Sequence, residues 1–148
     1  MEWDYIKQFH LNPPPTAVYL PRNKEVEVRY QQHKKEFKSI KDYILNTHFD
    51  SNSIDQGWVI VDNEFPYDCQ SNIRHFLIWI YPGKELSDQQ IIGIIQEYMN
   101  NNGHSEYAYF RNVPAIRSVL EIDHFHIFVK LADKFAPLLD DTELLLSK

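Results

Sequence analysis

Two strand-like segments with a clear helix between them constrain the fold of this chain more than any other feature. Residues 73–81, "IRHFLIWIY", are rich in β-branched and aromatic residues, and residues 121–129, "EIDHFHIFV", follow the two-residue period of a β-strand. Between them, residues 87–103 carry isoleucines at helical spacing, with Ser87 as the expected N-cap and an Asn-Gly stop. Elements of this kind bury their apolar sides only by packing on one another.

Weaker signals complete the order of elements. Residues 58–61 and 105–112 predict two further strands, and residues 25–49 predict one helix. Residues 50–57, "DSNSIDQG", are interpreted as a polar loop. The order helix, strand, strand, helix, strand, strand predicts an α+β fold, a mostly antiparallel sheet with helices packed on it.

The length of 148 residues predicts a single domain over residues 1–148, with the motif-bearing core at 58–130. Residues 1–24 include three consecutive prolines, each of which removes a backbone donor and fixes φ, so an extended N-terminal arm wrapped on the domain is expected. The tail, residues 131–148, is expected to pack on the domain. Docking of its apolar patch on an unidentified protein partner is the alternative.

Charge and composition exclude several classes of protein. The formal net charge is -6, whereas a protein that binds duplex DNA normally has a basic surface. Cys69 is the single cysteine, so the chain can form no intrachain disulfide and no Cys-based zinc motif. No apolar run approaches the length of a membrane span, and the first residues lack the apolar core of a signal peptide. These features predict a cytoplasmic protein with no membrane association.

Three histidines are the candidate catalytic residues. His124 and His126 are two apart on a strand and therefore share a face, with Phe128 next on that face. His75 lies on the strand of residues 73–81, where Ile73, Leu77 and Trp79 share its face. If the two strands are close, three imidazoles converge. They would then either attack phosphorus as a nucleophile or bind zinc. A solvated strand face is the structural alternative.

The segment "VDNEFPYDC", residues 61–69, is the second distinctive feature. Asn63 and Pro66 predict a rigid turn, because an asparagine side chain bonds local backbone and proline fixes φ. The turn is either purely structural or an edge that contacts a base or sugar. A basic cluster at residues 33–41 is interpreted as a solvated helix face, with phosphate contact as the alternative.

Taken in order, these motifs resemble the uncharacterised family of fungal N-acetylglucosamine-induced proteins over about residues 58–130. The matching pieces are an N-x-FPY turn, an I-R-H strand that ends in tryptophan, and a serine followed by an H-x-H strand. In this chain they fall on Asn63, Phe65, Pro66, Tyr67, Arg74, His75, Trp79, Ser118, His124 and His126.

More distantly, the same order is similar to the histidine-triad superfamily of nucleotide hydrolases, nucleotidyl transferases and cap scavengers. This resemblance implies a histidine-triad-like fold in which His126 attacks an α-phosphate, with His124 and His75 beside it. Three departures stand out: Phe128 replaces the third triad histidine, Arg74 replaces a glycine, and Ser118 lies farther from His124 than the pattern has it.

Two functions are therefore predicted as alternatives, neither of which needs a metal or other cofactor. The first is an enzyme that processes the phosphate of a nucleotide or sugar nucleotide, with Arg117 or Arg74 neutralising phosphate oxygens. The second is a non-catalytic module that binds a nucleotide or an mRNA cap, which would make the 5′ end of an RNA a partner. The expected substrate-binding residues are Asn63, Phe65, Tyr67, Trp79, Arg117, Ser118 and Phe128.

Overall fold

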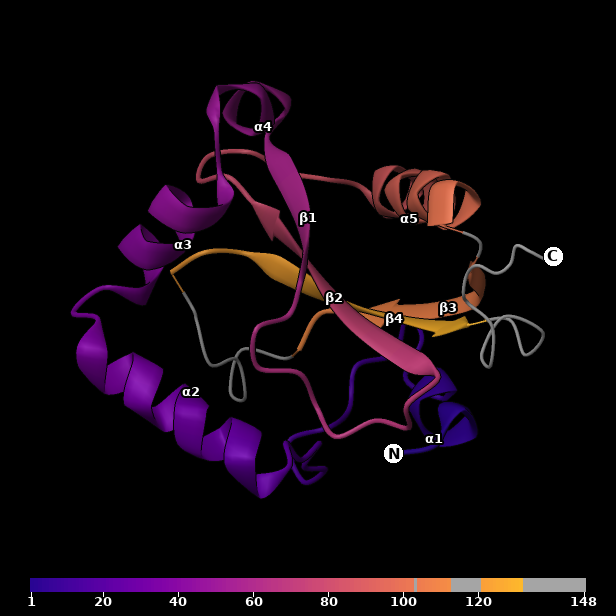
Figure 1. The fold of residues 1–148 in the computed structure, drawn as a ribbon. Helices are drawn as coiled ribbons and strands as arrows, with labels where there is room; N and C mark the ends of the chain where they lie inside the picture. Colours follow the sequence, from indigo (N-terminus) through magenta and orange to yellow (C-terminus); the bar gives the residue numbers. More distant parts are fainter. Residues whose placement is uncertain (103, 113–120, 132–148) are drawn as a thin grey trace, which may run out of the picture.

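The computed structural model describes residues 1–102, 104–112 and 121–131. In this part of the chain, four strands form one antiparallel sheet in the order β1-β2-β4-β3 (Figure 1). The strands are β1 (Trp58–Asp62), β2 (Ile73–Ile80), β3 (His104–Phe110) and β4 (His124–Leu131). The helices are α1 (Trp3–Lys7), α2 (Lys24–Glu36), α3 (Ile40–His48), α4 (Ser51–Gln56) and α5 (Asp88–Asn102). The predicted α+β class with an antiparallel sheet is confirmed.

Strand β4 lies inside the sheet, between β2 and β3. Its register with β2 sets His75 opposite Phe128, Leu77 opposite His126, and Trp79 opposite His124. Because side chains alternate across a strand, these six side chains share one face. The expectation that His75 lies on the face of His124 and His126 is therefore confirmed.

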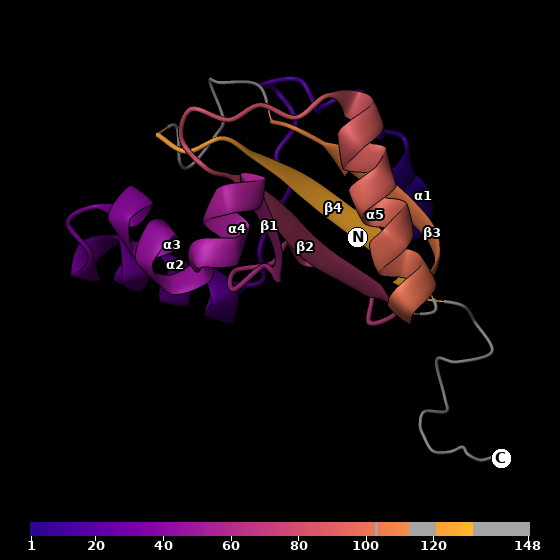
Figure 2. The same ribbon diagram turned by 90° about the horizontal axis from the view of Figure 1, so that it is seen from above.

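Helix α5 covers the opposite face of the sheet (Figure 2). Ile91 and Ile95 on α5 are fully buried against Phe76 and Ile127 of the two central strands. Ser87 caps the helix as expected, because its Oγ accepts a hydrogen bond from the Gln90 backbone at 3.2 Å. This layer is the apolar core that the alternating strands predict.

The histidine-bearing face is covered as well, at one end by the N-terminal segment and at the other by α3. Trp3 and Ile6 of α1 pack in one cluster with Phe128, and Ile44 of α3 packs in another with Trp79. The strand face of His124 and His126 is therefore not a solvated surface. Both histidines are about 95% buried.

The N-terminal segment differs from an entirely extended arm, because residues 3–7 form the short helix α1. The prolines that disfavour a helix begin only at Pro13, after α1 has ended. Phe9 and Leu20, farther along the segment, are buried in the same cluster as Trp3.

The prediction of one helix over residues 25–49 is wrong, and so is the polar loop over residues 50–57. The chain is extended at Phe37, after which Ser39 caps α3 by accepting a hydrogen bond from the Asp42 backbone. Asp50 and Ser53 then form a capping box, with each side chain accepting from the other's backbone, and α4 follows. The polar residues of this segment are helix caps rather than loop residues.

The expected packing of residues 131–148 lies outside the described residues, apart from Leu131 at the end of β4. Among the described helices, none has both the length and the apolar character needed to cross a membrane.

Candidate functional site

A cleft opens between the α2–α3 pair, the turn after β1, and the histidine-bearing face of the sheet. The volume inside it that the centre of a water molecule can reach is about 50 Å³, so the cleft is narrow. Its lining residues are Arg22, Tyr30, His33, Ile40, Tyr43, Ile44, His48, Asp62, Asn63, Glu64, Phe65, Leu77, Trp79, His124 and His126. The two histidines of β4 form part of its floor.

A hydrogen bond joins His75 to His126 beside this floor. His75 Nδ1 accepts the backbone N–H of Tyr67 at 3.1 Å, so in the neutral ring the proton of His75 is on Nε2. That Nε2 lies 2.9 Å from His126 Nδ1 and donates to it. Neutral His126 therefore carries its own proton on Nε2.

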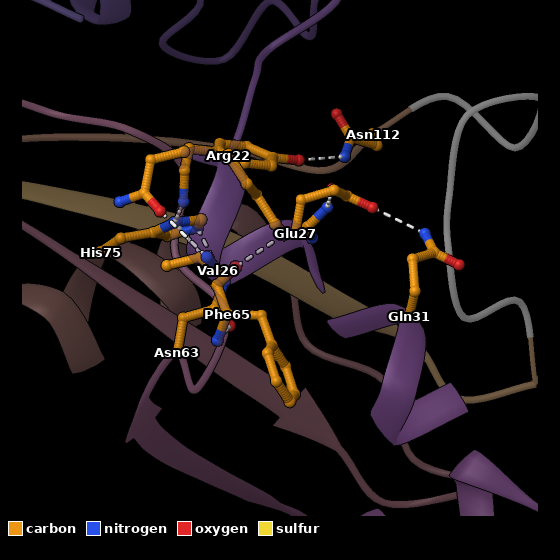
Figure 3. Close-up of polar contacts among 10 residues, drawn as sticks. Arg22, Val26, Glu27, Gln31, Asn63, Phe65, His75 and Asn112 are labelled. Carbon is orange, nitrogen blue, oxygen red and sulfur yellow. Dashed lines mark hydrogen bonds and ion pairs between the residues drawn. The ribbon is translucent and has the colours of Figure 1, made fainter. Parts of the chain in front are cut away.

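Asn112 closes the chain of hydrogen bonds at the other nitrogen of His126. The Asn112 amide lies 3.1 Å from His126 Nε2 and 3.1 Å from the hydroxyl of Tyr67. Since His126 Nε2 carries a proton, the amide group must present its oxygen there, an orientation reached by a 180° rotation of the amide from the one drawn in Figure 3. Both ring nitrogens of His126 are then engaged in hydrogen bonds.

Burial keeps this pair neutral. It lowers the pKa of His75 well below its ordinary value, and the charges of Arg22 and His124 lower that pKa further. Burial likewise lowers the pKa of His126, with His75, His124 and Arg22 acting in the same direction. Both imidazoles are therefore uncharged near neutral pH.

His124 has the opposite proton arrangement. Its Nδ1 lies 3.1 Å from the backbone oxygen of Ile122, which can only accept, so Nδ1 carries the proton. The lone pair of neutral His124 is therefore on Nε2. The ring packs 4.6 Å from that of Trp79 and edge-on to that of His126. Of the two β4 histidines, His124 has the tautomer that suits an attacking or accepting nitrogen.

The turn predicted around Asn63 is present and reaches both the cleft and the histidine pair. Asn63 Oδ1 accepts the backbone N–H of Phe65 at 2.9 Å, as expected for an asparagine turn. Its Nδ2 lies 3.4–3.5 Å from the two ring nitrogens of His75 (Figure 3). The carbonyl of Phe65 accepts from Arg22 Nε at 2.7 Å.

Arg22 is the principal cation of the cleft. Its guanidinium lies 4.2 Å from the Tyr30 ring centroid and 5.3 Å from that of Tyr67. Nη1 is 3.7 Å from a carboxylate oxygen of Glu27. No described residue accepts a hydrogen bond from Nη2, so part of the guanidinium is available to an anion.

Two further donors of the cleft wall have no hydrogen-bond partner in the described part of the chain. They are the Tyr30 hydroxyl and Trp79 Nε1, and both residues are more than 90% buried. An unpaired buried donor costs about 1–3 kcal/mol. Among the groups of this wall, the guanidinium of Arg22 favours a ligand with acceptor oxygens.

Acidic and aromatic side chains line the rim of the cleft. Glu64 accepts a hydrogen bond from the Tyr43 hydroxyl at 2.9 Å and lies 3.7 Å from His48 Nε2. Burial lowers the pKa of His48, and Glu64 partly offsets this. The His33 ring contacts three aromatic rings, with centroids 4.5–4.9 Å away; these belong to Phe37, Tyr43 and Phe65.

The structure separates the predicted site residues into three groups. The residues that line the cleft are His124, His126, Asn63, Phe65 and Trp79. His75, Tyr67 and Phe128 lie beside it without lining it; Phe128 is fully buried and its ring stacks on that of His75, with centroids 4.3 Å apart. Its role in substrate binding stays a prediction. Arg117 and Ser118 lie outside the described residues.

Arg74 lies on the other face of the sheet, as alternation predicts, and pairs there with Asp62 at 2.8 Å. The cation that lines the cleft is Arg22 instead of Arg74. The sequence did not predict Arg22, Tyr30 or Asn112 as residues of the site. Arg22 directly follows Pro21 in an irregular segment, and no periodic signal marks such a residue.

The zinc alternative does not fit the geometry of the histidine pair. Two nitrogens on one tetrahedral zinc lie about 3.3 Å apart, because each Zn–N bond is about 2.0–2.1 Å. His75 Nε2 and His126 Nδ1 are instead 2.9 Å apart and joined directly by a hydrogen bond. In residues 1–102, 104–112 and 121–131, no three His, Cys, Asp or Glu side chains gather in a way that would hold a metal ion.

Comparison with known proteins gives one family, one curated relative and one solved structure with a similar fold. Residues 3–130 match the family described as "Protein of unknown function (DUF3605)". N-acetylglucosamine-induced protein 1 of Candida albicans is 29% identical over 130 residues, which cover 76% of this chain and 50% of that protein. The chain thus spans about half the length of this curated relative. Both matches support the predicted fungal family.

Among solved structures, the chain described as "Crystal Structure of HTC1" superposes with a TM-score of 0.56 and 18% identity, covering 90% of this chain and 86% of that one. At this identity the match shows a shared fold alone. The resemblance to the histidine-triad superfamily stays a prediction.

Proposed function

This chain belongs to the DUF3605 family of proteins of unknown function, and from the geometry of its cleft we propose that it binds a nucleotide or sugar nucleotide there. The phosphate would contact Arg22, and the base or sugar would lie against the aromatic side chains of the cleft. The name of the Candida relative refers to N-acetylglucosamine, which makes a nucleotide derivative of that sugar a reasonable first ligand.

One observation carries this proposal: Arg22, which lines the cleft, has a guanidinium nitrogen, Nη2, from which no described residue accepts a hydrogen bond. The Tyr30 hydroxyl and Trp79 Nε1 are further hydrogen-bonding groups of lining residues that have no partner in the described part of the chain. Phosphate supplies acceptor oxygens and the negative charge that a guanidinium prefers. Phe65 and His33 add ring faces on which a base can stack.

His126 is not the nucleophile in this proposal. Its Nε2 carries a proton and faces Asn112, and its Nδ1 accepts from His75, so neither nitrogen offers a lone pair to phosphorus. The histidine pair instead fixes the floor of the cleft. Binding without turnover is therefore the function that the geometry favours.

Phosphate transfer is the second candidate, and the His124 tautomer is the observation in its favour. His124 Nε2 would attack phosphorus and form an N–P bond as the P–O bond to the leaving group breaks. The leaving oxygen would take a proton from solvent, and water would later release the phosphate. The distant histidine-triad resemblance fits this candidate, except that the nucleophile is His124, two residues before the expected His126 on the same strand.

A calorimetric binding series tests the proposal. The probes are AMP, UDP-N-acetylglucosamine, 7-methyl-GTP and inorganic phosphate, each titrated into wild type, Arg22→Gln and Arg111→Gln. Arg111 pairs with Asp123 and does not line the cleft, so it is the matched control. Loss of a charged hydrogen bond, about 1.5–3 kcal/mol, predicts roughly ten- to hundredfold weaker binding for Arg22→Gln alone. Wild type that binds none of the four probes rules the proposal out.

Turnover separates the two candidates. Purified His124→Asn and His126→Asn are compared with wild type for release of phosphate or nucleotide from the ligand that binds best. No turnover by wild type, with binding intact, supports the binding module. Turnover that is lost in His124→Asn supports transfer by His124. Turnover that survives in His124→Asn and is lost in His126→Asn contradicts the tautomer assignment.

A further inference from the structure

Four lysines surround the junction of α2 and α3, and we refer to them as the junction lysines: Lys34, Lys35, Lys38 and Lys41. None of them forms an ion pair with a described residue, although the chain has a net charge of -6. Other cations in the described part do pair, Arg74 with Asp62 and Arg111 with Asp123 among them. The junction therefore carries four lysines against Glu36 and Asp42, which is a local excess of positive charge in an acidic protein.

The helix dipole accounts for only half of this charge. Lys34 and Lys35 lie in the last turn of α2, where the partial negative charge of a helix C-terminus stabilises cations. Lys38 precedes the N-cap Ser39, and Lys41 lies in the first turn of α3, where the dipole disfavours a cation. Folding alone gives no reason for these two positions.

The junction lies close to residues that line the cleft. Lys34 Nζ lies 4.8 Å from the centroid of the Tyr30 ring, and Tyr30 lines the cleft. Lys41 follows Ile40, another lining residue. Figures 1 and 2 show α2 and α3 beside the sheet, with their junction at the outer edge of the molecule. A chain that leaves the cleft by this side meets the junction lysines.

We propose that the ligand of the cleft is the terminal nucleotide of a single-stranded nucleic acid, whose next phosphates lie along the junction lysines. This inference rests on the proposed function, because it assumes that the cleft holds a nucleotide. A single strand fits better than a duplex, since an unpaired terminal base can stack in the cleft and the remaining charge of the protein repels a long duplex. An acidic protein segment could pair with the lysines but would offer no base to stack on the rings of the cleft.

Fluorescence anisotropy with labelled 5′-phosphorylated oligouridylates of four and eight nucleotides, with UMP as an unlabelled competitor, tests the inference. The variants are Lys38→Gln/Lys41→Gln and the control Lys7→Gln/Lys84→Gln, in which both lysines are exposed and neither lines the cleft. Lys7 forms an ion pair with Glu106 at 3.8 Å, and Lys84 forms none with a described residue. Wild type is expected to bind the octamer at least tenfold more tightly than UMP at low salt. The junction double variant is expected to lose most of this gain and to keep its affinity for UMP.

Salt dependence gives a second readout. Each lysine that contacts a phosphate of a single strand contributes about 0.7 to the slope of log affinity against log salt concentration. The junction double variant is therefore expected to reduce that slope by about 1.4, and the control to leave it unchanged.

Several outcomes overturn the inference while the proposed function stands: UMP binding with no gain for the octamer, equal losses in the control variant, or equal competition by a poly-glutamate peptide of matched charge. Failure of wild type to bind UMP and the probes of the previous section overturns the proposed function itself. The inference is also overturned if the octamer binds but UMP does not displace it, because the terminal nucleotide would then not occupy the cleft.

Discussion

His75 Nε2 donates a hydrogen bond to His126 Nδ1 across 2.9 Å, and both imidazoles are buried and neutral. The direction of this bond is set two atoms away, because the backbone N–H of Tyr67 occupies His75 Nδ1. A local backbone turn thereby fixes the protonated nitrogen of His126, which lies 51 positions after His75 in the chain. This relation decides that Nδ1 of His126 accepts a hydrogen bond and offers no lone pair to a ligand in the cleft.

The buried pair predicts that the protein loses stability in mild acid. Below about pH 6.5 the unfolded chain takes up a proton on each histidine, while the lowered pKa values keep the folded pair neutral. The free energy of unfolding is therefore highest above this pH and falls as pH decreases toward the folded-state pKa values, by about 1.4 kcal/mol per pH unit for each histidine. Urea unfolding between pH 7.5 and 5 measures the slope.

The control for that slope is the double variant His75→Phe/His126→Phe, which retains His10, another histidine whose pKa burial lowers. Its stability is expected to vary less with pH than that of wild type, whatever its absolute value. Equal slopes for the two proteins would show that the pair does not carry the effect.

The Asn112 amide is expected to matter more for stability than the hydroxyl it contacts. Tyr67→Phe removes one hydrogen bond and is expected to cost about 0.5–1.5 kcal/mol. Asn112→Ala also leaves His126 Nε2 without this partner, so a cost of about 1–3 kcal/mol is expected. Chemical denaturation of both variants compares the two, and a smaller loss for Asn112→Ala would contradict the assigned hydrogen bonds.

Tyr30→Phe is expected to cause no loss of stability, because the Tyr30 hydroxyl has no hydrogen-bond partner in the described part of the chain. The variant should be as stable as wild type or slightly more stable. If the proposed function holds, it should also bind the proposed nucleotide several-fold more weakly. Thermal unfolding and calorimetry check the two effects on one protein. Weaker binding together with a clear loss of stability would mean that the hydroxyl has a structural role instead.

Two glycines provide a matched pair for backbone conformation. Gly57 ends α4 at φ +95°, in the left-handed region, and a Cβ there would lie 3.0 Å from the Lys84 side chain. Gly57→Ala is expected to cost about 1–2 kcal/mol. Gly93 lies exposed within α5 with open space at its Cβ position, so Gly93→Ala should stabilise the protein by about 0.5–1 kcal/mol. Denaturation midpoints of the two variants should move in opposite directions.

The periodic part of the sequence predicts its structure well. Strands β2 and β4 and helix α5 have long, regular patterns, and their limits in the structure differ from the expected ones by only a few residues. The segment from Ser39 to Gly57 is predicted poorly, because its helices are too short for periodicity to emerge and are defined by caps at Ser39 and Asp50. Polar residues at caps and in loops look alike in a sequence.

The sequence by itself determines that His75, Leu77 and Trp79 share one face of a strand, and that His124, His126 and Phe128 share one face of another, because alternation is a local property of extended backbone. Only the tertiary structure decides that these faces coincide, that His75 stands opposite Phe128 and reaches His126, and that Arg22 and Asn112 complete the surroundings. Those contacts join distant parts of the chain through strand register and through helices that cover both sheet faces. The hydrophobic period of a single segment specifies neither the register between two strands nor the packing of helices on the sheet.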